Sequence, residues 1–225
     1  MEKQPIHIVW FKRDFRLVDN EALFHANQSG VPLLLVCFFE PSVMNYPDSD
    51  VRHWRFIYES IQDLNKKLRL FNATIYFFHN EVKTVFSELI QEYEVKTVFS
   101  HQEIGNKLTF DRDLAMKEFF QSNGITWNEF QMHGVIRRLK SRQDWDKRWE
   151  QVMRDTPKMI KESDLNTITL HSDFYNRIIG VELSPEITNS NPNFQRGGEY
   201  WAWRYLDSFV KERYVNYSKH ISKPA

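Results

Sequence analysis

The chain has 225 residues, and its 30 lysines and arginines balance its 30 aspartates and glutamates, so the formal net charge is zero. This length predicts one domain with an appendage, and any nucleic-acid affinity has to come from a local basic patch. The single cysteine, Cys37, excludes an intrachain disulfide framework and fits a reducing compartment. We expect a cytoplasmic protein, because no apolar signal segment follows Met1 and no apolar stretch approaches the roughly 20 residues that span a bilayer.

Short apolar runs, rich in β-branched and aromatic residues, predict buried parallel strands. They cover residues 6–11, 33–39, 74–78, 96–100 and 126–130. Longer amphipathic segments lie between them, and right-handed β-α-β crossovers place such helices over a sheet. The sequence therefore predicts an α/β fold: a five-stranded parallel, doubly wound (Rossmann-like) sheet with helices on both faces, followed by a connector and one C-terminal helix.

Capping residues indicate where the predicted helices begin and end. Asp19 is expected to cap the first helix, and Gly30 to end it by adopting a positive φ. Ser49 or Asp50 is expected to cap the second, which carries apolar residues at helical spacing as far as Leu68. The other two helices are expected over 81–93 and 108–123.

One heptapeptide, Glu-Val-Lys-Thr-Val-Phe-Ser, occurs at 81–87 and again at 94–100. The first copy continues into Glu88-Leu89-Ile90, which extends a helical stripe, whereas the second runs into a loop. We predict a helix for the first copy and a strand for the second, because context overrides identical local propensity.

The sheet pattern ends near residue 131, so we divide the chain into an α/β domain (1–131), a connector (132–193) and a C-terminal segment (194–225). Residues 132–153 are rich in charge and tryptophan, and 156–193 indicate a surface linker, partly disordered. From about 198 to 218, one face of a predicted amphipathic helix is apolar and is expected to be exposed. Its members are Trp201, Tyr205, Leu206, Phe209 and Val210.

The turn after the first strand is basic and contains no glycine-rich phosphate loop. It reads Lys12-Arg13-Asp14-Phe15-Arg16, at the sheet edge where ligands of doubly wound folds bind. A simple ion-pair cluster of Arg13, Asp14, Arg16 and Asp19 explains the same residues equally well. No metal site and no activated nucleophile are expected, because the eight histidines lack ligand spacing.

The basic and aromatic residues of 134–149 form the strongest candidate for a nucleic-acid contact. Arginine and lysine hold phosphates, and tryptophan stacks on bases. Acidic residues interleave with them, however, so a solvated amphipathic helix is the preferred interpretation and the DNA contact the alternative.

Several motifs together resemble the cryptochrome/photolyase family of blue-light flavoproteins. They are 9–23 (Val-Trp-Phe-Lys-Arg-Asp-Phe-Arg-Leu-Val-Asp-Asn-Glu-Ala-Leu), Glu40-Pro41, and 194–199 (Phe-Gln-Arg-Gly-Gly-Glu) with the helix and Tyr217 that follow. The loop after the fourth predicted strand, His101-Gln102-Glu103-Ile104-Gly105-Asn106, departs from the family pattern, which indicates a divergent branch.

The resemblance implies an antenna chromophore in the α/β domain: methenyltetrahydrofolate, a deazaflavin or FMN. Arg13, Glu40 and Arg52 match positions that line the antenna pocket, and Phe38, with Phe39 beside it, is a candidate to stack there. Glu103 is a further candidate for the pocket, or else a loop carboxylate that caps the fourth helix.

The resemblance also implies FAD in a helical domain that begins near residue 194. Tyr217, seven residues before Pro224, matches the tyrosine that contacts the FAD phosphate. A phenol can donate a hydrogen bond to a phosphate oxygen.

For the whole protein the resemblance implies a DNA photolyase, which splits pyrimidine dimers in damaged DNA by light-driven electron transfer from FAD. This chain alone is expected neither to hold FAD tightly nor to repair DNA, and no catalytic residue is assigned in it. A cryptochrome photoreceptor is the alternative within the family. Outside it, a stand-alone nucleotide-binding module or an interaction domain that dimerises through the C-terminal helix stays open.

Overall fold

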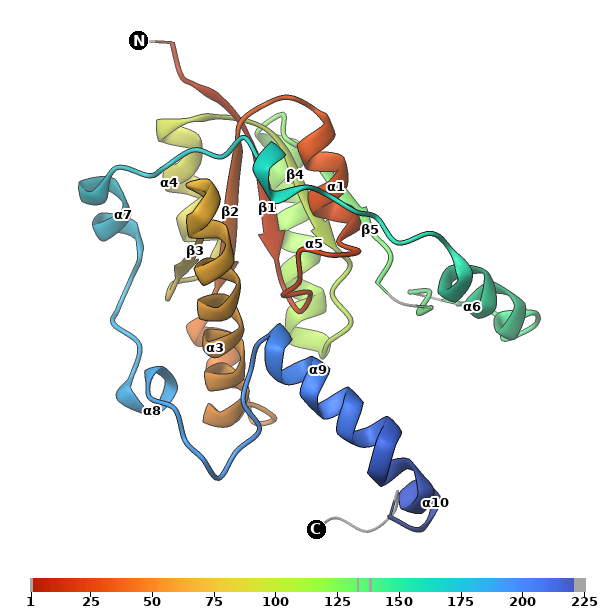
Figure 1. Ribbon diagram of the computed structural model, residues 1–225. Coiled ribbons are helices and arrows are strands. Elements are labelled where there is room, and N and C mark those ends of the chain that lie inside the picture. The colour runs from red at the N-terminus through yellow and green to blue at the C-terminus, as the bar shows by residue number, and fades with distance from the viewer. Residues whose placement is uncertain (1, 133, 138, 221–225) are drawn as a thin grey trace.

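The computed structural model describes residues 2–132, 134–137 and 139–220. Within these residues the centre is a five-stranded parallel sheet in the order β3-β2-β1-β4-β5 (Figure 1). The strands are β1 (Pro5–Phe11), β2 (Leu33–Phe38), β3 (Ile75–Phe78), β4 (Glu94–His101) and β5 (Thr126–Phe130). The predicted strands are confirmed, because strands buried on both faces need nearly continuous apolar runs such as β2.

Helices cover both faces of the sheet, as predicted (Figure 1). The helices α1 (Glu21–Gln28) and α3 (Val51–Leu68) share one apolar core with the sheet, whereas α4 (Val82–Glu92) and α5 (Lys107–Ser122) share the other. A short helix, α2 (Pro41–Met44), follows β2, and a 3₁₀ turn over Arg69–Phe71 follows α3. Each of the four longer helices, α1, α3, α4 and α5, buries side chains against the sheet, which is the hydrophobic basis of the fold.

The helix ends agree with the predicted signals in two places and differ in one. Asp50 caps α3 by accepting a hydrogen bond from the Arg52 backbone at 2.9 Å, and Gly30 has a φ of 73°. The prediction that Asp19 caps α1 is wrong, because the N-cap is Asn20, whose side chain accepts from the Leu23 backbone at 3.0 Å. Asp19 itself adopts the left-handed conformation just before it.

The two copies of the heptapeptide form the two structures predicted for them. In α4 the first copy buries Val82, Val85 and Phe86, which lie three and one residues apart on one helical face. In β4 the second copy becomes part of the central sheet, where it pairs with β1 and β5. Tertiary context, rather than local propensity, decides the conformation of this sequence.

The connector packs on the domain along 156–193, which corrects the prediction that this stretch is partly disordered. It contains α6 (Trp145–Arg154), a 3₁₀ turn over Glu162–Asp164, α7 (Ser172–Ile178) and α8 (Pro185–Thr188). Its apolar side chains enter both cores: Leu165, Leu170, Phe174, Ile178, Leu183 and Ile187 are buried. These residues are widely spaced in a polar segment, so no periodic pattern in the sequence predicts that they are buried.

After α6 the connector returns across the α1 face and passes the outer side of β3 (Figure 1). Gly180 pairs with His79, which directly follows β3, and the Tyr175 hydroxyl donates to the Phe77 carbonyl at 2.9 Å. The connector thereby covers an edge strand whose backbone groups would otherwise be open to pairing with another chain.

The C-terminal segment projects away from the domain (Figure 1). Its helical part, as far as the structure describes it, consists of α9 (Glu199–Ser208), a π-helical turn (Phe209–Arg213), a 3₁₀ turn (Tyr214–Asn216) and α10 (Tyr217–His220). The single regular helix predicted over 198–218 is therefore interrupted. In the part of the chain that the structure describes, no helix combines the length and apolar character needed to cross a bilayer.

Candidate functional site

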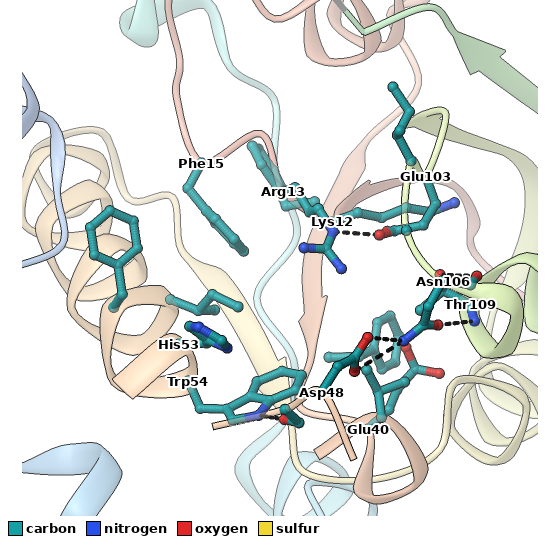
Figure 2. A pocket seen from close by; sticks show the side chains of 18 of the residues that line it. Lys12, Arg13, Phe15, Glu40, Asp48, His53, Trp54, Glu103, Asn106 and Thr109 are labelled. Carbon is teal, nitrogen blue, oxygen red and sulfur yellow. Dashed lines mark hydrogen bonds and ion pairs between the residues drawn. The ribbon is translucent and has the colours of Figure 1, made fainter. Parts of the chain in front are cut away.

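A cavity of about 860 Å³ opens at the carboxyl ends of β1, β2 and β4. Figure 2 shows His53 and Trp54 of α3 facing Glu103 and Asn106 across it, with Arg13 above. Ligands of doubly wound folds bind at this edge, and the volume lies in the usual range for small-molecule sites. The cavity therefore lies beside the basic turn over 12–16 that follows β1, at the sheet edge where the sequence analysis expected a ligand.

All five residues predicted for the antenna pocket line this cavity: Arg13, Phe38, Glu40, Arg52 and Glu103. Phe39, the neighbour of Phe38, does not, since it lies fully buried in the opposite core with its ring 5.8 Å from that of Trp54. Successive residues of an extended segment point to opposite sides, so only one of the two phenylalanines can face the cavity.

Aromatic side chains from separate parts of the chain supply flat walls to the cavity. The sequence prediction missed Phe15, Trp54, Phe56 and Phe194, which all line it. The Trp54 indole donates a hydrogen bond to the Ser49 hydroxyl at 2.7 Å, which fixes the ring plane. Such walls suit a planar, conjugated ligand, because aromatic rings pack favourably face to face with an offset or edge to face.

Two half-exposed arginines stand at the mouth of the cavity. The side chains of Arg13 and Arg52 are 53% and 56% exposed. Arg13 donates through Nε to Glu103 at 2.5 Å, and Arg52 Nε lies 3.6 Å from Asp50. Because only Nε of each is engaged by the described residues, the terminal nitrogens can bind a phosphate or carboxylate.

The floor of the cavity holds a buried carboxylate and a guanidinium. Arg112 donates through Nη1 to Glu40, and its Nη2 lies 2.9 Å from Asp113 and 3.6 Å from Glu103. Burial raises the pKa of Glu40 to about 7, although the Arg112 charge opposes the rise. Near neutral pH, Glu40 can therefore either donate or accept a hydrogen bond.

Lys12 also lines the cavity at its floor, and its side chain is almost wholly buried. Its ammonium is 3.0 Å from Asp113 and sits over the rings of Trp10 and Trp127, at 4.3 and 4.9 Å from their centroids. Burial lowers the pKa of Lys12, and the Asp113 carboxylate works against this. The rings and the carboxylate together compensate a charge that burial would otherwise disfavour.

The ion-pair cluster considered for the turn after β1 is not formed. Asp14 instead accepts a hydrogen bond from His101 Nδ1 at 2.5 Å, and Arg16 donates to the Asp19 carbonyl. Burial raises the pKa of Asp14, but the hydrogen bond and charge of His101 outweigh it and the pKa is lowered. This buried pair joins the turn to the end of β4.

The alternative that Glu103 is a loop carboxylate that caps the fourth predicted helix, α5, is wrong. Asn106 caps α5 by accepting a hydrogen bond from the Thr109 backbone at 3.1 Å, and its amide donates to Asp48. Glu103 pairs with Arg13 and approaches Arg112 instead. It therefore connects the mouth of the cavity to its floor.

Tyr217 does not belong to this cavity. It begins α10, is half-exposed, and its ring stands edge-on to Phe209 at 5.5 Å. Pro224, whose spacing from Tyr217 resembles the family motif, lies outside the described residues.

In the structure, the basic and aromatic residues of 134–149 fall into an inward-facing group and an exposed group. Arg137 faces inward and pairs with Glu129 at 2.5 Å, whereas every residue of α6 is exposed, with the rings of Trp145 and Trp149 stacked at 6.4 Å. Arg138 lies outside the described residues. The DNA contact stays a prediction.

Comparison with known proteins agrees with the motifs of the sequence. The family model for DNA photolyase matches residues 7–165. Cryptochrome-1 of Macaca fascicularis is 26% identical over 116 residues, which is 52% of this chain and 20% of that protein. The chain thus matches a minor part of the length of this relative.

Two solved structures share the fold. An archaeal photolyase from Sulfolobus tokodaii with two FAD molecules has a TM-score of 0.67 at 20% identity, covering 89% of this chain and 46% of that one. A cryptochrome of Synechocystis has a TM-score of 0.70 at 18% identity, covering 97% and 49%. The chain spans about half the length of each. With its α/β sheet, its cavity and the match over 7–165, the chain belongs to the cryptochrome/photolyase family.

Proposed function

We propose that this chain is the α/β portion of a blue-light flavoprotein and that its cavity holds a light-harvesting chromophore. The observation that carries the proposal is the convergence of Arg13, Arg52 and Glu40 with aromatic walls around one cavity of about 860 Å³. Candidate chromophores are methenyltetrahydrofolate, a deazaflavin and FMN, which all combine a flat ring with polar or anionic groups. The Sulfolobus tokodaii photolyase, crystallised with two FAD molecules, supports a second chromophore in a relative.

Each part of the cavity has a task in this proposal. When bound, the chromophore absorbs near-ultraviolet or blue light. Trp54 and Phe15 stack on its ring, while Arg13 and Arg52 hold its anionic groups at the mouth. Glu40 hydrogen-bonds a polar ring edge at the floor and, with Arg112 behind it, fixes the orientation of the ring.

For the whole protein we propose DNA photolyase activity: repair of pyrimidine dimers by light-driven electron transfer from FAD. Tyr217 would then contact the FAD phosphate, and damaged DNA would bind through a helical domain that begins near residue 194. A cryptochrome photoreceptor without repair is the second candidate, supported by the similarity to Cryptochrome-1.

An absorption titration tests the antenna proposal. The purified chain is mixed in turn with methenyltetrahydrofolate, deazaflavin and FMN, and the near-ultraviolet and blue bands are followed. Binding with a shifted band is expected for at least one of them. Arg52→Ala should weaken it about tenfold, since a hydrogen bond to a charged group contributes about 1.5–3 kcal/mol. Arg69→Ala removes an exposed arginine outside the cavity and should change nothing. A well-folded chain that binds none of the three would contradict the proposal.

FAD retention and dimer repair test the assignment of the other tasks to the helical domain. We expect the chain alone to lose FAD on gel filtration and to leave a thymine-dimer oligonucleotide unrepaired under blue light. Stoichiometric FAD on the purified chain, or repair by it, would show that residues 1–225 already contain the catalytic site.

A further inference from the structure

The start of the C-terminal segment, directly after the connector, supplies one wall of the cavity. Phe194 and Gln195 line it, although they lie some 140 residues along the chain from α3, which forms the adjacent wall. The Phe194 ring is 41% exposed and lies 5.3 Å from the guanidinium of Arg55. Arg55 is buried on α3, donates to the Glu186 carbonyl at 2.9 and 2.6 Å, and keeps Nη1 without a partner among the described residues. Phe194 is thus held to α3 by a face-on cation contact.

The start of α9, which follows Phe194 and Gln195 in the chain, is hydrogen-bonded to α3. The backbone amides of Gly197, Gly198 and Glu199 donate in succession to side chains of α3. The acceptors are Glu59 at 2.7 Å, Ser60 at 3.1 Å and Asp63 at 2.9 Å. We call these six residues the joint. Amide groups at the start of a helix lack partners within it, and acidic side chains there also suit the helix dipole.

Both glycines are required by the geometry of the joint. A Cβ on Gly197 would overlap the Phe56 carbonyl oxygen, and Gly198 has a φ of 105°, where its Cβ would press on Asp63. Lys67 adds an ion pair to Glu199 at 2.5 Å. The joint therefore holds the chain against α3 in one close arrangement that a side chain at either glycine would disturb.

We propose that Phe194 contacts the ligand of the cavity and that the joint positions it, so that ligand binding and docking of α9 stabilise each other. Only Gln195 and Arg196 separate Phe194 from Gly197, and the Arg196 amide is itself fixed by the Tyr205 hydroxyl at 3.1 Å. One helix, α3, carries cavity residues such as Trp54 and joint residues such as Asp63. The inference rests on the proposed chromophore site, and the coupling must be equal in both directions.

Hydrogen exchange measures the first direction. The probe is FMN, replaced by the folate or the deazaflavin if the titration shows that one of those binds instead. With the probe at saturation, exchange of the amides of 197–199 should slow at least about fivefold, the lower end of usual coupling strengths. Exchange in α4, on the opposite face of the sheet, should not change. Phe194→Ala should weaken probe binding and abolish the slowing, whereas Phe194→Tyr should restore both.

Probe affinity measures the reverse direction. Gly198→Ala alters the joint without touching the cavity lining, and it should weaken probe binding about fivefold or more. Gly124→Ala is the matched control, because Gly124 also has a positive φ but lies outside the cavity with open space around it. If a probe binds while joint exchange and the affinity of the Gly198 variant are unchanged, the coupling is wrong and the chromophore site stands. If no probe binds the unaltered chain, both are wrong.

Discussion

At the scale of single residues, the cavity floor concentrates buried charge. Lys12, Glu40, Arg112 and Asp113 come from three separate segments and alternate in sign, so each charge meets an opposite one. Burying an ionised group is costly unless it is paired and hydrogen-bonded, and a large apolar residue would pack here at less cost. Residues kept in such an arrangement beside a cavity point to a ligand rather than to stability alone.

Glu40 gives this arrangement a measurable pH dependence. Glutamate ordinarily titrates near 4.5, whereas burial raises the pKa of Glu40 to about 7 in the folded chain. Between these values the folded state keeps a proton that the unfolded state has lost. The free energy of unfolding should therefore fall as the pH rises from about 4.5 to about 7, by at most about 1.4 kcal/mol per pH unit. Urea denaturation at a series of pH values would measure this slope.

Substitution isolates the contribution of Glu40. Glu40→Gln cannot titrate, so the decline in stability across the window should be shallower than in the unaltered chain. Glu118→Gln, at an exposed position on α5, should keep the original slope. Equal slopes for all three chains would mean that Glu40 ionises normally.

The sequence could indicate which residues of the site are basic or acidic, but not their partners. Arg13, Glu40 and Arg52 stand in recognisable motifs, and they do line the cavity. Phe194 stands in the motif 194–199 and Arg112 on a predicted helix, but neither pattern places the residue at the cavity. They reach the cavity only because β4 leads into α5 beside β1 and because the connector returns to α3, and a local pattern contains neither fact.

At the scale of elements, the sequence predicts the sheet and its helices but not how the connector packs on them. Strands and helices of the domain follow from apolar periodicity, and even the repeated heptapeptide is resolved by the residues that follow each copy. The connector buries isolated residues such as Leu165 and Ile187 in a polar segment. Its place is set by contacts with β3 and α3, which composition alone cannot supply.

Gly180 makes that connector contact testable. Its φ is 87°, and a Cβ would overlap the His79 carbonyl oxygen beside β3. Gly30 has a similar φ of 73° but open space around it. Gly30→Ala should cost about 1–2 kcal/mol for the left-handed backbone, whereas Gly180→Ala should cost roughly 1–3 kcal/mol more for the overlap. Urea denaturation of both variants measures the difference, and equal losses would mean that the connector does not press on β3.

At the scale of the whole molecule, two projections leave apolar side chains uncovered. On the C-terminal one, Leu206 and Val210 are 50% and 57% exposed, with Trp203 and Tyr214 also exposed. On the other, α6 exposes Trp145, Trp149, Val152 and Met153. Contiguous apolar patches of this kind mark interaction surfaces or association liabilities. In a longer family member, the helical domain proposed here would be the natural cover for the first.

If the C-terminal face is uncovered in solution, the isolated chain should associate through it. Sedimentation equilibrium should then show a dimer fraction that rises with concentration. The paired change Leu206→Glu with Val210→Glu places like charges on that face and should weaken association about tenfold or more. Val152→Glu with Met153→Glu makes the same change on α6. Weakening by the first pair alone locates the contact on α9 and the turn after it, whereas weakening by the second alone would move it to α6. A chain that stays monomeric throughout would show that the exposed face does not drive self-association.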